Sequence, residues 1–331
     1  MGRVLFHTSL GALITACVLV YDSARAAESP SPPMDAKPAE VVLTEEAAGL
    51  LDKWGGQAGY RGRAFEKIQE ALKVNPNYPN AYYVLARYYA ADGFINDNAY
   101  KPGSLEAAVG AAQKALAVDP HFSEANVYMG WLYAQMKDLP KAQAALDEAK
   151  QMGSKSIWLD LNQAELYWRQ QQFDKAAPIY KAIAANEKRN SKALGTAYRN
   201  LINYYCRKDD RKHAFEMYQS LLTLDPRSAW TRGDYAMSLI YWFGDFDGGI
   251  AKAREALALL DYPMGRYTLA FALYGKWATL TLAKRDAVVA EQYFEEAVTL
   301  LPVASVISSP WITSPKFRPI LDALKASGRA P

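Results

Sequence analysis

The sequence predicts an all-α protein built from paired helices. From Thr44 onward, apolar residues recur with helical spacing, and the alternation typical of strands is almost missing. Three Asx-Pro pairs, Asn75-Pro76, Asp119-Pro120 and Asp225-Pro226, each follow a helical stretch. Because proline disfavours helix in the residue before it, each pair is expected to end a helix. The last two pairs are 106 residues apart, close to three units of about 34 to 35 residues, which indicates a repeat array.

The first 26 residues are typical of an export signal. Arg3 supplies a positive start, Val4 to Tyr21 is a mostly apolar run, and Ala24-Arg25-Ala26 offers the small residues at which a signal peptidase cuts. Residues 1–26 are therefore interpreted as a signal peptide, with the mature chain beginning at Ala27 in the periplasm or outside the cell. The run is short and interrupted for a bilayer span, so no transmembrane segment is expected in the mature chain.

A second processing route stays open at Cys17. Ile14-Thr15-Ala16-Cys17 resembles a loose bacterial lipobox, in which the cysteine would carry a lipid anchor. The apolar run continues from Val18 to Tyr21, however, where lipoproteins usually turn polar. This continuation favours the simple signal peptide.

Charge and cysteine content bound the partners and the stabilising chemistry. The formal charge of +3 falls to +2 once Arg3, Asp22 and Arg25 are removed with the signal. A nearly neutral chain favours neither nucleic acid nor an anionic membrane as a partner. Cys206 is then the only cysteine left, so no intramolecular disulfide is expected and packing must stabilise the fold.

Three further segments are expected after the signal. Residues 27–43 are rich in Pro and Ser and are interpreted as a linker. The helical array occupies 44–304, with an insertion at about 94–103 whose apolar side chains either pack on the array or meet a partner. Residues 305–331 form a capping segment with a terminal helix at 316–327. The buried stripe of this helix is expected to be Phe317, Ile320, Leu321 and Leu324.

Small, bulky and aromatic residues recur at set positions of successive helix pairs. The positions that carry this pattern are Tyr82, Leu85, Ala86, Tyr89, Ala108, Ala112 and Ala115; Met129, Gly130, Tyr133, Ala142, Leu146 and Ala149; Ala164, Tyr167, Ala176 and Tyr180; and Tyr198, Leu201, Tyr205, Ala214, Tyr218 and Leu221. The pattern resembles the tetratricopeptide-repeat (TPR) family over about four-fifths of the chain. The resemblance implies a right-handed α-solenoid of about six to seven helix pairs, closed by a C-terminal capping helix.

Chemistry-bearing residues are sparse. Beyond the signal the chain has only two histidines, His121 and His213, and neither has a partner at metal-ligand spacing. Asp209-Asp210 precede a helix and are interpreted as capping residues. The protein is therefore expected to be no enzyme and to use no metal or cofactor.

In the TPR family, the first helix of each repeat lines the concave side. The resemblance implies partner-binding positions at Tyr83, Arg87, Trp131, Trp158, Trp168, Arg169, Arg199, Asn203, Arg207, Tyr241 and Trp242, with Asn80, Gln135, Glu165 and Asp234 beside them. Trp168, Arg169, Arg199 and Arg207 are expected to be exposed and to form the main anchor. Trp, Tyr and Arg dominate binding energy in protein interfaces, which favours a protein or peptide partner in envelope or secretion-related assembly. Aromatic faces also stack on sugars, so a glycan remains the alternative.

Overall fold

The computed structural model describes residues 37–54, 59–96, 99–185 and 190–330. The expected signal peptide and most of the expected linker lie outside the described residues. Within them the first fourteen helices form seven consecutive pairs, at the upper end of the expected number. The pairs are α1 (Ala39–Lys53) and α2 (Tyr60–Val74), α3 (Pro79–Gly93) and α4 (Ser104–Val118), α5 (Ser123–Gln135) and α6 (Leu139–Gln151), α7 (Ile157–Arg169) and α8 (Phe173–Ala184), α9 (Ser191–Arg207) and α10 (Arg211–Leu224), α11 (Ala229–Tyr241) and α12 (Phe246–Leu259), and α13 (Pro263–Leu282) and α14 (Ala287–Leu300).

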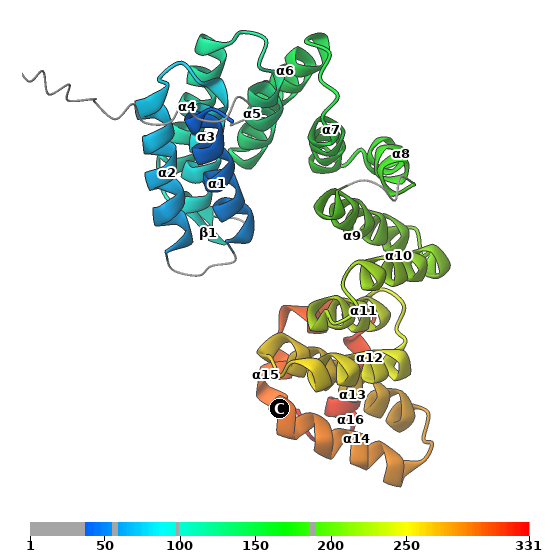
Figure 1. Cartoon of the computed structure of the whole chain (residues 1–331). Coiled ribbons are helices and arrows are strands. Elements are labelled where there is room, and N and C mark those ends of the chain that lie inside the picture. Colours follow the sequence, from blue (N-terminus) through cyan, green and yellow to red (C-terminus); the bar gives the residue numbers. More distant parts are fainter. Residues whose placement is uncertain (1–36, 55–58, 97–98, 186–189, 331) are drawn as a thin grey trace, which may run out of the picture.

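The pairs stack into a curved array (Figure 1). The block α1–α6 lies at one end and α11–α14 at the other, with α7–α10 between them. Through this central part α7 and α9 face the inside of the curve, whereas α8 and α10 lie on its outside. The fold is an all-α solenoid, as the sequence predicts.

The three Asx-Pro pairs end helices in the same way. Asn75, Asp119 and Asp225 each leave the helix in an extended conformation just after its last turn. The side-chain oxygen of each then accepts a hydrogen bond from the backbone N–H two residues later, at 2.9, 2.9 and 3.2 Å. This local turn explains why an Asx residue precedes the proline at each of these three helix ends.

Small residues let the two helices of a pair approach closely. A Cβ added to Gly130 on α5 would lie 2.4 Å from Leu146 Cδ2 on α6, so the buried Leu146 side chain would have to move. A Cβ on Gly249 of α12 would meet Ile240 of α11 at 2.2 Å. Gly249 therefore serves close packing, although by propensity alone it weakens its helix. Tyr180, Tyr198, Tyr205 and Tyr218, which the repeat pattern assigns to packing, are all buried.

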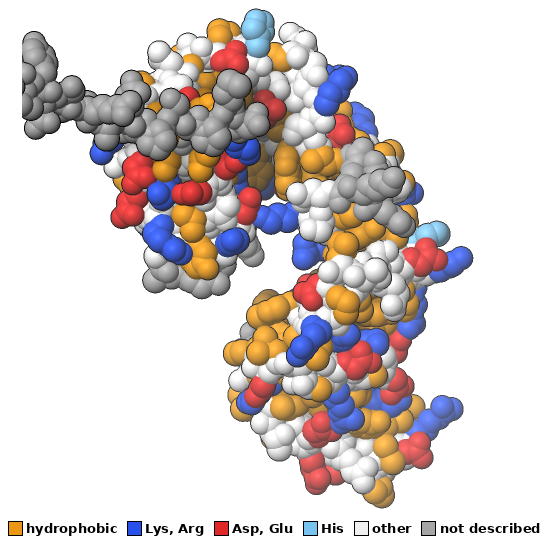
Figure 2. Space-filling model, in the orientation of Figure 1, with side chains coloured by type: hydrophobic (Ala, Val, Ile, Leu, Met, Phe, Trp, Pro, Cys, Tyr) orange, Lys and Arg blue, Asp and Glu red, His pale blue; other side chains and the backbone are white. Residues whose placement is uncertain are grey.

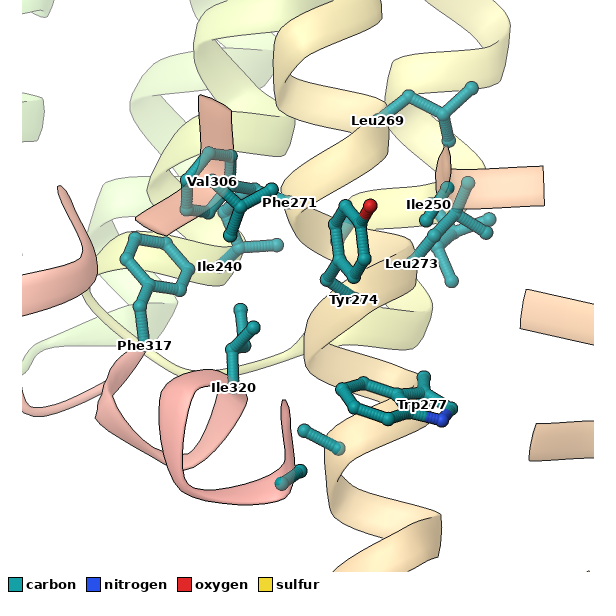
Figure 3. Packing of buried hydrophobic residues seen from close by; sticks show 14 of the residues in the cluster. Ile240, Ile250, Leu269, Phe271, Leu273, Tyr274, Trp277, Val306, Phe317 and Ile320 are labelled. Atoms are coloured by element: carbon teal, nitrogen blue, oxygen red, sulfur yellow. The ribbon is translucent and has the colours of Figure 1, made fainter. Parts of the chain in front are cut away.

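The C-terminal segment covers the last repeat. After α14 come the short α15 (Val303–Ser308), a 3-10 turn at Pro310–Thr313 and α16 (Arg318–Ala326). Phe317 and Ile320 pack beside Phe271, Tyr274 and Trp277 of α13 (Figure 3). Of the expected stripe, Phe317, Ile320 and Leu324 are completely buried and Leu321 is half-buried.

One expected boundary differs from the structure, and the insertion has structure of its own. Helix α1 begins at Ala39, directly after Pro38, five residues before the expected start of the array at Thr44. The insertion after α3 contains a small antiparallel hairpin, β1 (Phe94–Asn96) and β2 (Ala99–Tyr100). The Phe94 and Tyr100 rings meet edge to face at 5.8 Å, and Tyr100 packs on the core of α3–α5. The insertion thus folds back on the array, while Ile95 remains 58% exposed.

Across the described part of the chain, no helix combines the length and the apolar character that a bilayer crossing requires.

Candidate functional site

A pocket of about 810 Å³ lies on the concave side of the array, between α1–α6 and the central helices. Figure 2 shows the hollow in this region, with basic side chains beside it. Five successive first helices, α1, α3, α5, α7 and α9, supply its lining, together with Tyr180 of α8. The residues that line it are Gly49, Asp52, Lys53, Tyr83, Arg87, Glu124, Val127, Tyr128, Trp131, Gln135, Ser156, Trp158, Leu161, Asn162, Glu165, Tyr180, Asn190, Ser191, Lys192 and Thr196.

Aromatic rings form much of the pocket wall. Tyr128 and Trp131 stack with centroids 5.3 Å apart and planes 16° apart, and Tyr83 meets Tyr128 edge to face at 5.7 Å. Burial raises the pKa of Tyr83 and of Tyr128, so both hydroxyls stay neutral. Trp158, in the first turn of α7, is 39% exposed. These contacts hold a rigid apolar wall with one tryptophan free to meet a ligand.

An ion-paired cluster joins two distant helices at the pocket. Asp52 Oδ1 on α1 lies 2.9 Å from Arg87 Nη2 on α3 and 3.0 Å from Lys192 Nζ on α9. Asp52 and Lys192 are 140 residues apart in sequence, whereas repeats of a solenoid normally contact only their neighbours. The Asp52–Lys192 pair therefore bridges α1 and α9 across the concave side.

Removing this pair is expected to widen the groove. With spin labels at Glu45→Cys and Asn203→Cys, Lys192→Met should lengthen or broaden the measured distance distribution, because the exposed pair no longer holds α9 towards α1. A salt concentration of about 1 M should lengthen or broaden the distribution in the same way, because it screens the ion pair. Lys208→Met, which removes the same charge just after α9 and breaks only local contacts with Asp174 and the Tyr204 ring, should match the parent. Identical distributions for both variants would rule out a closing role for Lys192.

The pocket gathers four of the eleven predicted partner-binding residues: Tyr83, Arg87, Trp131 and Trp158. Gln135 and Glu165, predicted beside them, also line it. Arg169 flanks this site and does not line it. Its guanidinium pairs with Glu165 at 2.9 Å and donates to the Ala134 carbonyl at 3.1 Å.

The other predicted residues lie further along the array. Arg207 extends over the rings of Trp168, Phe173 and Trp242, with its guanidinium carbon 5.8, 4.7 and 6.0 Å from their centroids. Trp168 is thus half-buried in a packed cluster, and the expectation that it is exposed is wrong. Arg199 and Asn203 are exposed on α9. Tyr241 is half-buried against Trp242 and Phe317, at ring distances of 5.3 and 6.0 Å.

Sequence reasoning misses several lining residues, among them Asp52, Tyr128, Tyr180 and Lys192. Asp52 and Lys192 meet only because the solenoid curves. Tyr128 lies three residues before Trp131 on α5, so the i, i+3 spacing that places two side chains on one helix face could have identified it. The repeat pattern assigns Tyr180 to packing alone. In the structure Tyr180 is fully buried between helices and also lines the pocket.

The residues considered for chemistry have structural roles here. Asp210 caps α10, accepting from the His213 backbone N–H at 3.2 Å, and its other oxygen lies 2.6 Å from His213 Nδ1. Among the described residues no group of three His, Cys, Asp or Glu side chains is placed to hold a metal ion. Cys206 is 3% exposed, and burial raises the pKa of its thiol to about 11.

The thiol of Cys206 is therefore expected to react slowly in the folded protein. At pH 8 a thiol with a pKa of about 11 is almost entirely protonated, and the thiolate is the reactive form. Ellman's reagent should modify Cys206 fully in denaturant and only slowly without it. Rapid modification of the native protein would show that α9 does not bury this residue.

No protein-family model and no curated protein matches the sequence. Solved structures match by fold. The APC/C hetero-tetramer Cut9–Hcn1 aligns with a TM-score of 0.53 and 15% identity over 71% of this chain and 46% of that chain. A human IFIT1 dimer with m7Gppp-AAAA aligns with a TM-score of 0.52 and 16% identity over 90% of this chain and 70% of that one. A thermophilic TPR protein of Thermus thermophilus aligns with a TM-score of 0.48 and 21% identity, over 60% of this chain and 98% of that one.

This chain spans less than half of the first matched chain, and identities this low show the fold alone. Together with the paired helices and their recurrent small-residue contacts, the matches to Cut9–Hcn1 and IFIT1 establish the class: the chain is an all-α solenoid of paired helices, the fold that the TPR-like residue pattern implies.

Proposed function

We propose that the protein is an exported, non-catalytic scaffold that binds a segment of a partner protein in the concave pocket. The observation that carries the proposal is the lining itself: five successive first helices converge on one pocket with aromatic walls and charged edges. The volume lies within the range of pockets that bury a compact ligand. A partner could insert apolar side chains there and continue along the groove.

The composition of the pocket supports a protein partner. Aromatic and arginine side chains supply most binding energy in protein interfaces, and Tyr83, Arg87, Trp131 and Trp158 are of this kind. The ionisable lining residues balance, with Lys53, Arg87 and Lys192 against Asp52, Glu124 and Glu165. Binding to a nucleic-acid backbone depends on an excess of positive charge, which this pocket does not offer.

Capture from the native host tests the proposal. The tagged protein is crosslinked reversibly in cells, and enriched species are identified for the parent and for the double variant Trp131→Ala/Trp158→Ala. We expect a defined protein to be enriched by the parent and lost with the variant, while both remain folded. Enrichment of a glycan that the variant loses would mean that the aromatic wall stacks on sugar rings. A partner retained equally by both would place binding elsewhere.

Export is a separate part of the proposal. The basis is Arg3, the apolar run to Tyr21 and the small residues before Ala27. N-terminal sequencing of the protein from its native host should give a sequence that begins at Ala27. An exported protein of this kind would act in envelope or secretion-related assembly. A lipid-modified Cys17 would show the lipoprotein route, and an intact Met1 would contradict export.

A further inference from the structure

Tyr180 is the unusual member of the pocket lining. Every other described lining residue belongs to a first helix or to the residue that caps one, whereas Tyr180 belongs to α8 on the outer side of the array. To reach the pocket, its ring must pass inward between α7 and α9. The hydroxyl, at the far end of the ring, is therefore the part of Tyr180 nearest the pocket.

The hydroxyl of Tyr180 is buried without a hydrogen-bond partner. The side chain is 0% exposed, so folding has removed water from the hydroxyl without replacing its hydrogen bond. Such a group destabilises the folded chain until a partner is supplied. Asn162, another polar residue of the lining, directs its amide N–H to the Val127 carbonyl at 2.9 Å and not to Tyr180.

The same position one repeat later shows the ordinary arrangement. Tyr218 of α10 is also buried, but its hydroxyl donates to the Asp234 carbonyl at 2.9 Å and lies 2.8 Å from Ser238 Oγ. A buried tyrosine at this position can therefore be satisfied within the repeat. Tyr180 differs from Tyr218 in lining the pocket and in lacking that partner.

The lining of the pocket favours an aromatic group. Leu161 and Val127 contribute apolar surface, and the stacked Tyr128–Trp131 pair offers a flat wall. Aromatic rings pack favourably against such walls, in stacked or edge-to-face geometry. A group that satisfies both the wall and the hydroxyl has an aromatic body and a hydrogen-bonding tip.

We propose that the pocket takes a tyrosine side chain of the partner segment, whose phenol hydroxyl exchanges a hydrogen bond with Tyr180 Oη. This inference rests on the proposed function and names the residue type that the pocket selects. Because the hydroxyl is covered, wall side chains must shift as the phenol enters. Glu165 lines the pocket, and its ion pair with Arg169 is partly exposed, so this side chain can move at small cost.

Two side-chain probes, N-acetyltyrosinamide and N-acetylphenylalaninamide, test the proposal on the mature chain. Their dissociation constants are measured by saturation-transfer NMR titration. The parent should bind the tyrosine probe about two- to tenfold more tightly, the range expected from one net hydrogen bond. Tyr180→Phe should abolish the difference by weakening the tyrosine probe alone. Its thermal midpoint should not fall, because the substitution removes an unpaired buried hydroxyl.

Tyr218→Phe is the matched control, since it removes a buried hydroxyl one repeat later and should leave the discrimination intact. Trp158→Ala should weaken both probes, which places them in the pocket. The proposal is overturned by equal affinities in the parent, by discrimination that survives Tyr180→Phe, by binding independent of Trp158, or by no binding of the tyrosine probe at millimolar concentration. The proposed function fails separately, if partner capture is unaffected by the Trp131 and Trp158 substitutions.

Discussion

Replacing Ala142 with tryptophan is expected to destabilise the protein severely. Ala142 is completely buried on α6, in a cluster with Ala134, Leu146 and Leu166. Helix α5 lies directly against α6 here, because a Cβ on Gly130 would sit 2.4 Å from Leu146 Cδ2 and in contact with the Ala142 carbonyl oxygen. An indole cannot enter this space without forcing α5 and α6 apart.

The expected loss of unfolding free energy is about 3 kcal/mol or more, at or beyond the usual range for overpacking. Because each repeat of a solenoid is stabilised by its neighbours, opening one helix pair also weakens the next interface. Urea unfolding followed by circular dichroism at 222 nm measures the effect. Gln171→Ala is the control, because Gln171 is exposed in the turn before α8 and should change stability by no more than about 0.5 kcal/mol. Equal losses from both changes would mean that the repeat register is wrong.

Replacing Trp158 with alanine is expected to have the largest effect on binding. Trp158 presents an exposed indole to the pocket beside the rigid Tyr128–Trp131 wall. Truncating an aromatic anchor in an interface typically costs about 1 to 4 kcal/mol of binding free energy. The thermal midpoint should change little, because the residue is 39% exposed and few of its contacts support the fold.

Trp230→Ala provides the matched control for this change. Trp230 on α11 is 57% exposed, lies outside the pocket lining and contacts Tyr262 at a ring distance of 4.3 Å. Titration of the captured partner by isothermal calorimetry should show weakened binding for Trp158→Ala and parental affinity for Trp230→Ala. Equal affinities for the two variants would remove Trp158 from the site.

The sequence predicts the repeat array because its determinants are local. These determinants act over one or two helical turns and recur from one helix pair to the next. They include the Asx-Pro pairs that end helices, capping aspartates such as Asp210 and small residues such as Gly130. The predicted start of the array is too late because the Pro and Ser content before it suggests a linker. Pro38 directly precedes α1, and the alanine, glutamate and leucine that follow favour helix formation.

The candidate site is only partly predictable, for a physical reason. A fixed offset along each first helix selects Tyr83, Arg87, Trp131 and Trp158, which line the pocket. It treats all repeats alike, whereas curvature decides which inward faces meet. The contact of Asp52 with Lys192 depends on the summed rotation of several repeats, which no single repeat encodes.

Photocrosslinking at a single position tests the central claim most directly. A photoreactive phenylalanine analogue replaces Trp158 in one strain and Trp230 in another, and irradiated adducts in cells are identified by mass spectrometry. We expect a defined protein adduct at position 158, mapped to one segment of the partner, and no such adduct at position 230. The same adduct at both positions, or an adduct at 230 alone, would contradict binding in the concave pocket.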